Sequence, residues 1–278
     1  MNVDKRMFFV RNIGHLKDKE TEILEREFEI ITDANIIGGC DYGPYNFMMW
    51  DHTQKRSGEK RKLCMRVREK HFTKPEEQPV IRATENGLYH GGYIVDELVA
   101  LASLFLRRRI ELGKTVRLGN TPLIVSKRRE TMGLIDKEIV EGNSNLGELK
   151  EWFDLAVGLD EQYHQSFILA AVFYHKAVLI IEEYPDVAYI NLISSIEALS
   201  RDYDLGEIPI AEFDKALAKS IGLIEEDTLR KRIEKQILGR QKFLSRRFEK
   251  FIIDHIEEEF WDYREEKALV IKWGQAKK

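Results

Sequence analysis

The sequence predicts an α+β protein, with a mixed α/β N-terminal region over residues 1–145 and a mostly α-helical bundle over residues 146–278. The first observation is the alternation in residues 62–72, where apolar and polar side chains take turns as in a half-buried strand. The second is a change of texture near residue 145, where short, turn-rich segments give way to helical periodicity. A length of 278 residues suits one large domain or two small ones.

The N-terminal region contains several short segments that predict strands. Apolar runs at residues 6–10 and 46–50 are typical of strands, and in residues 62–72 the side chains of Leu63, Met65 and Val67 share one face. Residues 18–30 fit both a charged helix and an edge strand, and residues 113–122 fit a short strand or a loop.

Residues 95–109 predict a helix. The apolar positions follow helical spacing, Asp96 and Glu97 stand at the start, and three arginines stand at the end. Acidic residues near the first turn and basic residues near the last turn complement the helix dipole. This explains the three arginines without any ligand.

The second part of the chain reads as a series of helices. Residues 147–159 form the first, with Gly158 as a plausible stop. Residues 161–184 are apolar almost all round, which is typical of a helix in the centre of a bundle. Pro185 ends that helix, and the next one contains residues 189–200.

The remaining C-terminal segments are also expected to be helical. They cover residues 210–223, 225–261 and 264–273. The middle one is too long for an ordinary single helix, so we expect a break or kink at Gly239.

Composition and charge narrow the class of protein. Hydrophobic residues make up 43% of the chain and charged residues 33%, and the formal net charge is −4. Such a chain builds a sizeable core, but it has no overall basic field to attract nucleic acid, so binding would need a local patch. The two cysteines, Cys40 and Cys64, form no metal-binding pattern and are expected to be reduced thiols of a cytoplasmic protein.

No membrane association is expected. The longest apolar run, residues 167–174, is eight residues long, whereas a bilayer span needs about twenty. The N-terminal apolar run is too short for the core of a signal peptide.

Motifs for catalysis, metals and cofactors are missing from the sequence. There are seven histidines but no H-E-x-x-H, and no G-x-S-x-G, Walker A or dinucleotide fingerprint occurs. His164 and His175 lie eleven residues apart on one predicted helix, too far apart to ligate one ion, so structural roles are favoured. We therefore predict no catalytic residue, no metal site and no cofactor.

One basic cluster is a candidate nucleic-acid site. Its members lie in residues 240–250 with phenylalanines between them, and the candidates are Arg240, Lys242, Arg246 and Arg247. At helical spacing such a stripe could meet phosphates. Glu249 and the acidic residues 257–259 follow closely, however, and they favour a solvated helix face.

The stretch "YINLISSIEALS" (189–200) holds a carboxylate, Glu197, in an apolar helix. Glu197 precedes Arg201 by four residues, so the two pair favourably if Glu197 lies at the edge of the apolar stripe. If Glu197 points inward instead, it needs a buried donor, and Glu197, Asn191 and Arg201 then form a candidate buried polar site. The small residues Ser194, Ser195 and Ala198 permit the close approach of a neighbouring helix.

This stretch also carries a family resemblance. A long apolar helix, a Pro-Asp turn and a helix reading "NLISSIEALS" resemble the HEPN superfamily, most closely the Apea-like HEPN domains. Residues 95–119 resemble the upstream element of those domains, and residues 248–261 resemble the amphipathic helix before their last one. The resemblance implies a helical bundle that forms homodimers and, in many members, a metal-independent ribonuclease.

The ribonuclease motif of that superfamily, Arg-x4–6-His, is missing after residue 200. The only histidine there is His255, and Arg246 and Arg247 precede it by nine and eight positions. Arg66 and His71 match formally, but they lie in a predicted strand, and such a match arises easily by chance. The expected catalytic segment would follow residue 273, and whether residue 278 is the natural end stays open.

The sequence leads to two hypotheses of function. The first is a HEPN-like, non-catalytic protein of RNA handling or of defence against mobile elements, with RNA and a second copy as partners. The alternative is a helical protein–protein interaction or regulatory module with no nucleic-acid activity.

Overall fold

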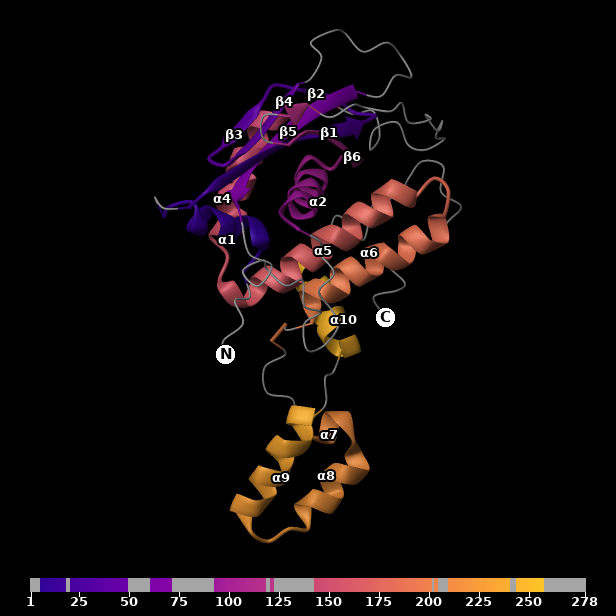
Figure 1. Ribbon diagram of the computed structural model, residues 1–278. Coiled ribbons are helices and arrows are strands. Elements are labelled where there is room, and N and C mark those ends of the chain that lie inside the picture. The colour runs from indigo at the N-terminus through magenta and orange to yellow at the C-terminus, as the bar shows by residue number, and fades with distance from the viewer. Residues whose placement is uncertain are drawn as a thin grey trace. The chain divides into compact units, whose positions relative to one another are not determined.

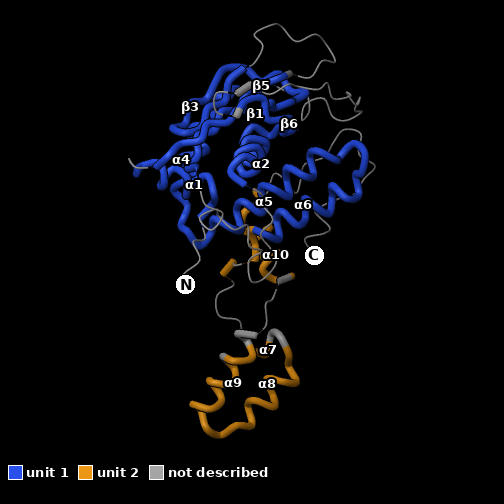
Figure 2. Tube along the Cα trace, viewed as in Figure 1, with its two compact units in different colours: residues 1–198 blue, residues 199–278 orange. Residues whose placement is uncertain are grey.

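The computed structural model describes the chain in segments, namely residues 6–18, 21–49, 61–71, 93–118, 121–122, 143–201, 203–204, 210–240 and 244–257. The chain divides into two compact units, Met1–Ala198 (unit 1) and Leu199–Lys278 (unit 2), which Figure 2 distinguishes by colour. Unit 1 combines a sheet with helices and the described part of unit 2 is helical, which confirms the predicted α+β class.

Unit 1 is built on an antiparallel sheet with the strand order β3-β4-β5-β1-β6-β7 (Figure 1). Its strands are β1 Ile23–Thr32, β3 Cys40–Tyr42, β4 Tyr45–Met49, β5 Arg61–Lys70, β6 Ile110–Leu118 and β7 Thr121–Pro122. A separate parallel pair joins β2, Asn35–Ile37, to β8, Asn143–Asn145.

Three predicted strands are present in the sheet. The strands expected at 46–50 and 62–72 correspond to β4 and β5, and residues 113–122 contribute to β6 and β7. The ambiguous segment 18–30 forms most of β1, which pairs with β5 on one side and with β6 on the other. It is therefore an interior strand, and its alternate residues Phe28 and Ile30 are buried on the core face.

The strand predicted at residues 6–10 is wrong, because the chain there enters helix α1, Phe8–His15. The helix has no side-chain cap of its own. Instead, the Glu97 carboxylate accepts hydrogen bonds from the backbone N–H groups of Phe8 and Phe9 at 3.0 and 2.9 Å. A distant acid thus satisfies the first N–H groups of α1, which short-range sequence pattern cannot reveal.

Besides α1, the α-helices of unit 1 lie on one side of the sheet (Figure 1). They are α2 Ile94–Leu106, α4 Leu149–Val157, α5 Glu161–Ile180 and α6 Pro185–Ser200, the last of which extends two residues past the unit boundary. A short 3-10 turn, Leu146–Glu148, precedes α4. Figure 1 shows α2 between the sheet and α5.

The core of unit 1 lies between the sheet and α2. Phe47, Leu98, Leu101 and Phe153 are almost completely buried there. Helix α5 packs against α2 and β6, so the expectation that residues 161–184 form the centre of a C-terminal bundle is wrong. Its apolar surface is covered by a sheet-bound helix instead.

The boundary between the units also differs from the predicted one. The sequence placed it after residue 145, where helical periodicity begins, whereas the compact units divide after Ala198. The change of texture marks the end of the sheet, but α4 and α5 still bury apolar side chains against the sheet unit.

Unit 2 contains short helices, of which the structure describes α7 Ile210–Phe213, α8 Lys215–Gly222, α9 Asp227–Arg240 and α10 Leu244–His255. The Asp214 carboxylate caps α8 by accepting from the backbone N–H groups of Ala216 and Leu217, both at 2.9 Å. The long segment 225–261 is divided as expected, with Gly239 one residue before the end of α9.

None of the helices in the described segments is both long enough and apolar enough to cross a bilayer.

Candidate nucleic-acid interface

The predicted basic residues divide between two helices of unit 2. Arg246 and Arg247 lie on α10, and Arg240 is the last residue of α9. The side chain of Arg240 and the whole of Lys242 lie outside the described residues. The structure therefore places two of the four candidates on one described helix.

One face of α10 carries Arg247, Phe251 and His255, which follow each other at intervals of four residues. The Arg247 guanidinium donates a hydrogen bond to the backbone carbonyl of Arg201. The rings of Phe251 and His255 stack, with centroids 4.3 Å apart, and the ring of Tyr203 meets both of them edge-on. Arg201 and Tyr203 thus pack against this face.

Lys250 and Asp254 lie beside these rings. Lys250 Nζ is 5.5 Å from the ring centroid of Tyr203 and 3.0 Å from Asp254 Oδ2. The Tyr203 hydroxyl donates to the same Asp254 oxygen at 2.8 Å. These two contacts, first the hydrogen bond from Tyr203 and then that from Lys250, lower the pKa of Asp254. Lys250, Asp254 and Tyr203 therefore contact one another directly at the surface of the protein.

The spacing of Arg247 and His255 bears on phosphodiester cleavage. Eight residues of α-helix separate them by about 12 Å along the helix axis. Nδ1 of His255 lies 2.9 Å from the backbone carbonyl of Phe251, to which it donates a hydrogen bond. Arg247 is bonded to the Arg201 carbonyl and His255 to the Phe251 carbonyl, so the two side chains are held by different partners.

The predicted polar site around Glu197 is not buried. Glu197 is exposed, so its inward orientation is wrong. Asn191 is bonded within its own helix, where its Nδ2 donates to the carbonyl of Val187 at 3.0 Å. The residues of α6 that face α5 are small, and Ser195 Oγ donates to the Ala170 carbonyl of α5 at 2.8 Å. A carboxylate is costly to bury without a partner, and the exposed edge avoids this cost.

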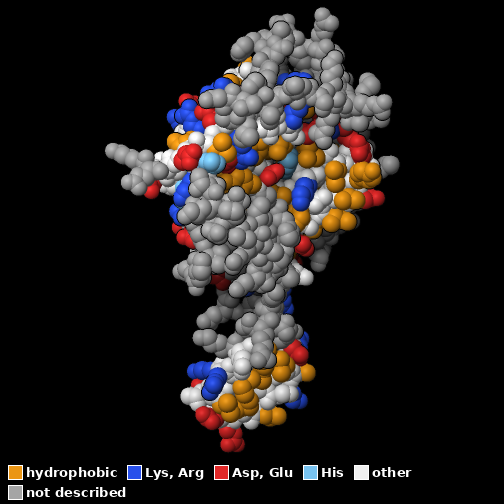
Figure 3. Space-filling model, in the orientation of Figure 1, with side chains coloured by type: hydrophobic (Ala, Val, Ile, Leu, Met, Phe, Trp, Pro, Cys, Tyr) orange, Lys and Arg blue, Asp and Glu red, His pale blue; other side chains and the backbone are white. Residues whose placement is uncertain are grey.

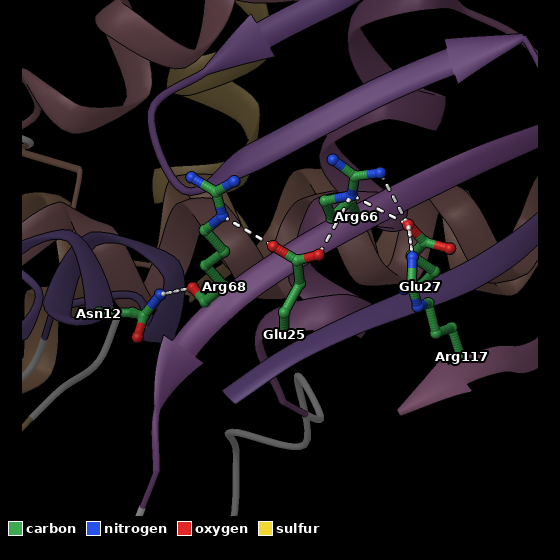
Figure 4. A network of polar contacts seen from close by, with 6 residues as sticks. All are labelled: Asn12, Glu25, Glu27, Arg66, Arg68 and Arg117. Carbon is green, nitrogen blue, oxygen red and sulfur yellow. Dashed lines mark hydrogen bonds and ion pairs between the residues drawn. The ribbon is translucent and has the colours of Figure 1, made fainter. Parts of the chain in front are cut away.

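A second polar cluster lies on the face of the sheet opposite to Phe28 and Ile30. Figure 4 shows it as a ladder across β1, β5 and β6, formed by Glu25, Glu27, Arg66, Arg68 and Arg117. Arg66 NH2 lies 2.8 Å from Glu27 Oε1, and Arg68 Nε lies 2.9 Å from Glu25 Oε2. Because acidic and basic side chains are interleaved, the ladder presents no continuous basic surface.

Of the formal match to the ribonuclease motif, Arg66 belongs to this ladder and His71 follows the end of β5. The hydrogen bond to Glu27 raises the pKa of Arg66 above its ordinary value, and Glu25 lies nearby. His71 Nδ1 lies 3.3 Å from a carboxylate oxygen of Glu22. Carboxylates of β1 bind the Arg66 guanidinium, which therefore links two strands of the sheet.

The histidines of α5 have structural partners, as the sequence favoured. His164 Nδ1 accepts from the backbone N–H of Met7 at 3.2 Å, and its Nε2 donates to the Leu159 carbonyl at 2.9 Å. His175 Nε2 lies 2.7 Å from the Ile110 carbonyl, and burial lowers the pKa of this histidine. Both rings tie α5 to other segments of unit 1.

The two thiols are buried and free. Burial raises the pKa of Cys40 to about 11, as it does for Cys64. Both groups are therefore protonated at neutral pH, in the form that is a poor nucleophile. Among the described residues there is also no cluster of three or more histidine, cysteine or acidic side chains that could hold a metal ion.

Comparisons with known proteins give no match, whether with family models, with curated proteins or with solved structures.

Proposed function

We propose that this protein binds single-stranded RNA without cleaving it and acts in the cytoplasm in RNA handling or in defence against mobile elements. The proposed contact is the α10 surface, which we define by the cations and rings gathered there, namely Tyr203, Arg246, Arg247, Lys250, Phe251 and His255. The observation that carries the proposal is the position of Lys250 beside the ring cluster.

The chemistry of the α10 surface suits a single strand. Lysine and arginine side chains neutralise backbone phosphates, and aromatic rings supply faces on which unpaired bases stack. Such stacking contributes about 1–3 kcal/mol per base. Because Asp254 offsets part of the charge of Lys250, we expect moderate affinity that falls steeply with salt.

The proposal includes no cleavage because Arg247 and His255 are engaged separately, by the Arg201 and Phe251 carbonyls. General acid–base catalysis needs the proton donor within hydrogen-bond reach of the reacting oxygen, and the stabilising cation must meet the same phosphate. The resemblance of residues 189–200 to HEPN domains supplies the RNA context of the proposal. It rests on hydrophobic pattern and on no shared catalytic residue.

The test compares two lysines that make the same local ion pair. Lys250 pairs with Asp254 at 3.0 Å and Lys231 pairs with Asp227 at 2.9 Å, each four residues away on its helix. The difference between the two lysines is the ring of Tyr203 beside Lys250. We expect Lys250→Gln to weaken the binding of a fluorescent single-stranded RNA about threefold to tenfold. The slope of log affinity against log salt concentration should fall by about one, as for one lost phosphate contact.

Fluorescence anisotropy at several salt concentrations measures both quantities. Lys231→Gln should leave affinity and slope unchanged. Equal effects of the two substitutions would mean that only overall charge matters and would contradict the proposed site.

The alternative function, a helical protein–protein interaction module, also has an observation in its favour. Tyr184, just before α6, and Val187, Tyr189 and Ile190, in its first two turns, expose about half or more of their surface. On the face drawn in Figure 3, hydrophobic side chains gather over the α5–α6 region. If the wild-type chain retains no RNA at moderate salt, this alternative is favoured, with a second copy of the chain as the first partner to test.

A further inference from the structure

The three consecutive arginines after α2 have three different environments. Arg109 is largely buried and lies 2.6 Å from carboxylate oxygens of both Asp33 and Glu182. Arg108 donates to the backbone carbonyls of Arg107 and Asn143 at 3.0 and 3.1 Å. Arg107 is exposed, and no ion pair joins its guanidinium to a described residue.

Arg107 also has an unfavourable backbone conformation. Its φ of 53° and ψ of 45° place it in the left-handed region, and it is the one described residue other than glycine with a positive φ. The backbone N–H of Arg107 bonds to the Leu104 carbonyl, and that of Arg108 bonds to the Ser103 carbonyl at 3.1 Å. This is the helix-ending motif in which glycine is the usual residue at the left-handed position.

The helix dipole explains a positive charge near the end of α2, but it does not explain this position. An arginine anywhere in the last turn would complement the carbonyl end equally well, without left-handed strain. In α2 the last turn contains no basic residue. The charge is therefore held at the one position where the backbone is strained, which points to a role for the Arg107 side chain itself.

Tyr174 of α5 supplies a third group near the two arginines. Helix α5 packs against α2, and Nε2 of the adjacent His175 lies 2.7 Å from the carbonyl of Ile110, three residues after Arg107, so Tyr174 lies on the part of α5 next to the arginines. Burial raises the pKa of the Tyr174 hydroxyl, and the charges of Arg107 and Arg108 oppose that rise. It makes no hydrogen bond with any residue in the described segments. Nε of Arg108 is also a donor without an acceptor among these residues.

We propose that Arg107, Arg108 and Tyr174 form a binding site for a phosphate group. Guanidinium groups bind phosphate oxygens through charge-assisted, geometrically specific hydrogen bonds, and a tyrosine hydroxyl adds a neutral donor. Among the described residues, no carboxylate pairs with Arg107 or Arg108, whereas two carboxylates bind Arg109. This site belongs to unit 1 and does not depend on the RNA contact proposed for α10.

Arg107→Gly separates the ligand role from the structural one, because the two roles predict opposite changes. Glycine relieves the left-handed strain, so the variant should unfold about 2–4 °C higher than the wild type in buffer without phosphate. Its affinity for inorganic phosphate should fall at least about tenfold, since a charge-assisted hydrogen bond is lost. Arg107→Lys keeps the charge and the strain, and should retain most of the affinity.

Thermal unfolding at increasing phosphate, with ionic strength held constant by sodium chloride, measures both effects. Tyr174→Phe should reduce the phosphate-dependent rise in Tm. Unlike Arg107→Gly, it should not raise the Tm in buffer without phosphate. Lys219→Gln, on the exposed side of α8, is the charge control and should leave the rise unchanged.

The source of the phosphate is distinguished by titrating three probes: inorganic phosphate, and one RNA oligonucleotide with either a 5′-phosphate or a 5′-hydroxyl end. Arg107-dependent binding of inorganic phosphate alone identifies a small anion. Arg107-dependent preference for the 5′-phosphate identifies a strand end, and equal Arg107-dependent binding of both RNAs identifies the backbone. The proposal is overturned if no probe gives a saturable response, or if Arg107→Gly gains stability and keeps its full affinity for every probe.

Discussion

At the scale of single residues, Glu97 has the largest structural consequence in unit 1. Its side chain is fully buried in α2, and its two carboxylate oxygens accept from the first N–H groups of α1. The sequence assigned Glu97 to the dipole of its own helix, where it does stand in the first turn. The second role could not be predicted, because the partners lie almost ninety residues earlier and are backbone groups without a sequence signature.

Glu97→Gln should therefore destabilise the protein although it is nearly isosteric. The glutamine amide keeps one acceptor and turns an N–H₂ group toward a backbone N–H, so one buried hydrogen bond is lost and two donors face each other. We expect the free energy of unfolding to fall by about 2 kcal/mol. Urea unfolding measures the change, and hydrogen exchange of the α1 amides shows where it arises.

The matched control is Glu151→Gln on the exposed side of α4. It should change the stability by less than about 0.5 kcal/mol. If the two substitutions had equal effects, or if α1 amides kept their protection in Glu97→Gln, the Glu97 carboxylate would not be what holds α1.

At the scale of elements, the contact between β1 and β6 depends on Gly113. The register of the two strands shifts on both sides of Phe28, so Glu29 lies in an irregular part of the ladder. A Cβ added to Gly113 would lie 2.8 Å from the backbone carbonyl oxygen of Glu29 and 3.0 Å from its Cβ. The close approach of two backbones explains a glycine inside a strand.

Gly113→Ala should cost about 1–3 kcal/mol, because the backbone of β1 must move to admit the methyl group. Gly14→Ala is the opposite case, since nothing lies within 4 Å of its added Cβ and Gly14 is part of α1. It should be neutral or stabilise by up to about 1 kcal/mol. Urea midpoints of the two variants test both signs, and a loss of similar size in both would refute the explanation by close approach.

The elements that the sequence predicted are those whose own residues carry the signal. β5 alternates in burial from Met65 to Lys70 and α5 has a continuous apolar surface, so a short stretch of sequence is enough to predict both. β1 was ambiguous because its outward residues Glu25 and Glu27 are equally typical of a helix. The α10 surface was predicted only in part, since Tyr203 and Lys250 are far apart in the sequence and meet only after folding.

At the scale of the whole molecule, the two units differ in how much core they hold. The hydrophobic core cluster, from Met7 to Val172, lies entirely within unit 1. In the described part of unit 2, Ile210 and Ile221 are the buried hydrophobic residues. Because buried apolar surface supplies most of the folding free energy, unit 1 has the material to fold alone and the described part of unit 2 has little.

A chain of residues 1–200, which keeps α6 whole, should therefore fold without unit 2 and retain one cooperative urea transition. The ring packing of Phe105 against Trp152 lies within this chain, so its near-ultraviolet circular dichroism should keep a tertiary signal. A chain of residues 199–278 should unfold broadly and at low urea, because few buried side chains hold its described helices together. An aggregated or non-cooperative 1–200 chain would show that the sheet unit needs the C-terminal residues, and the division after Ala198 would then not be a boundary of stability.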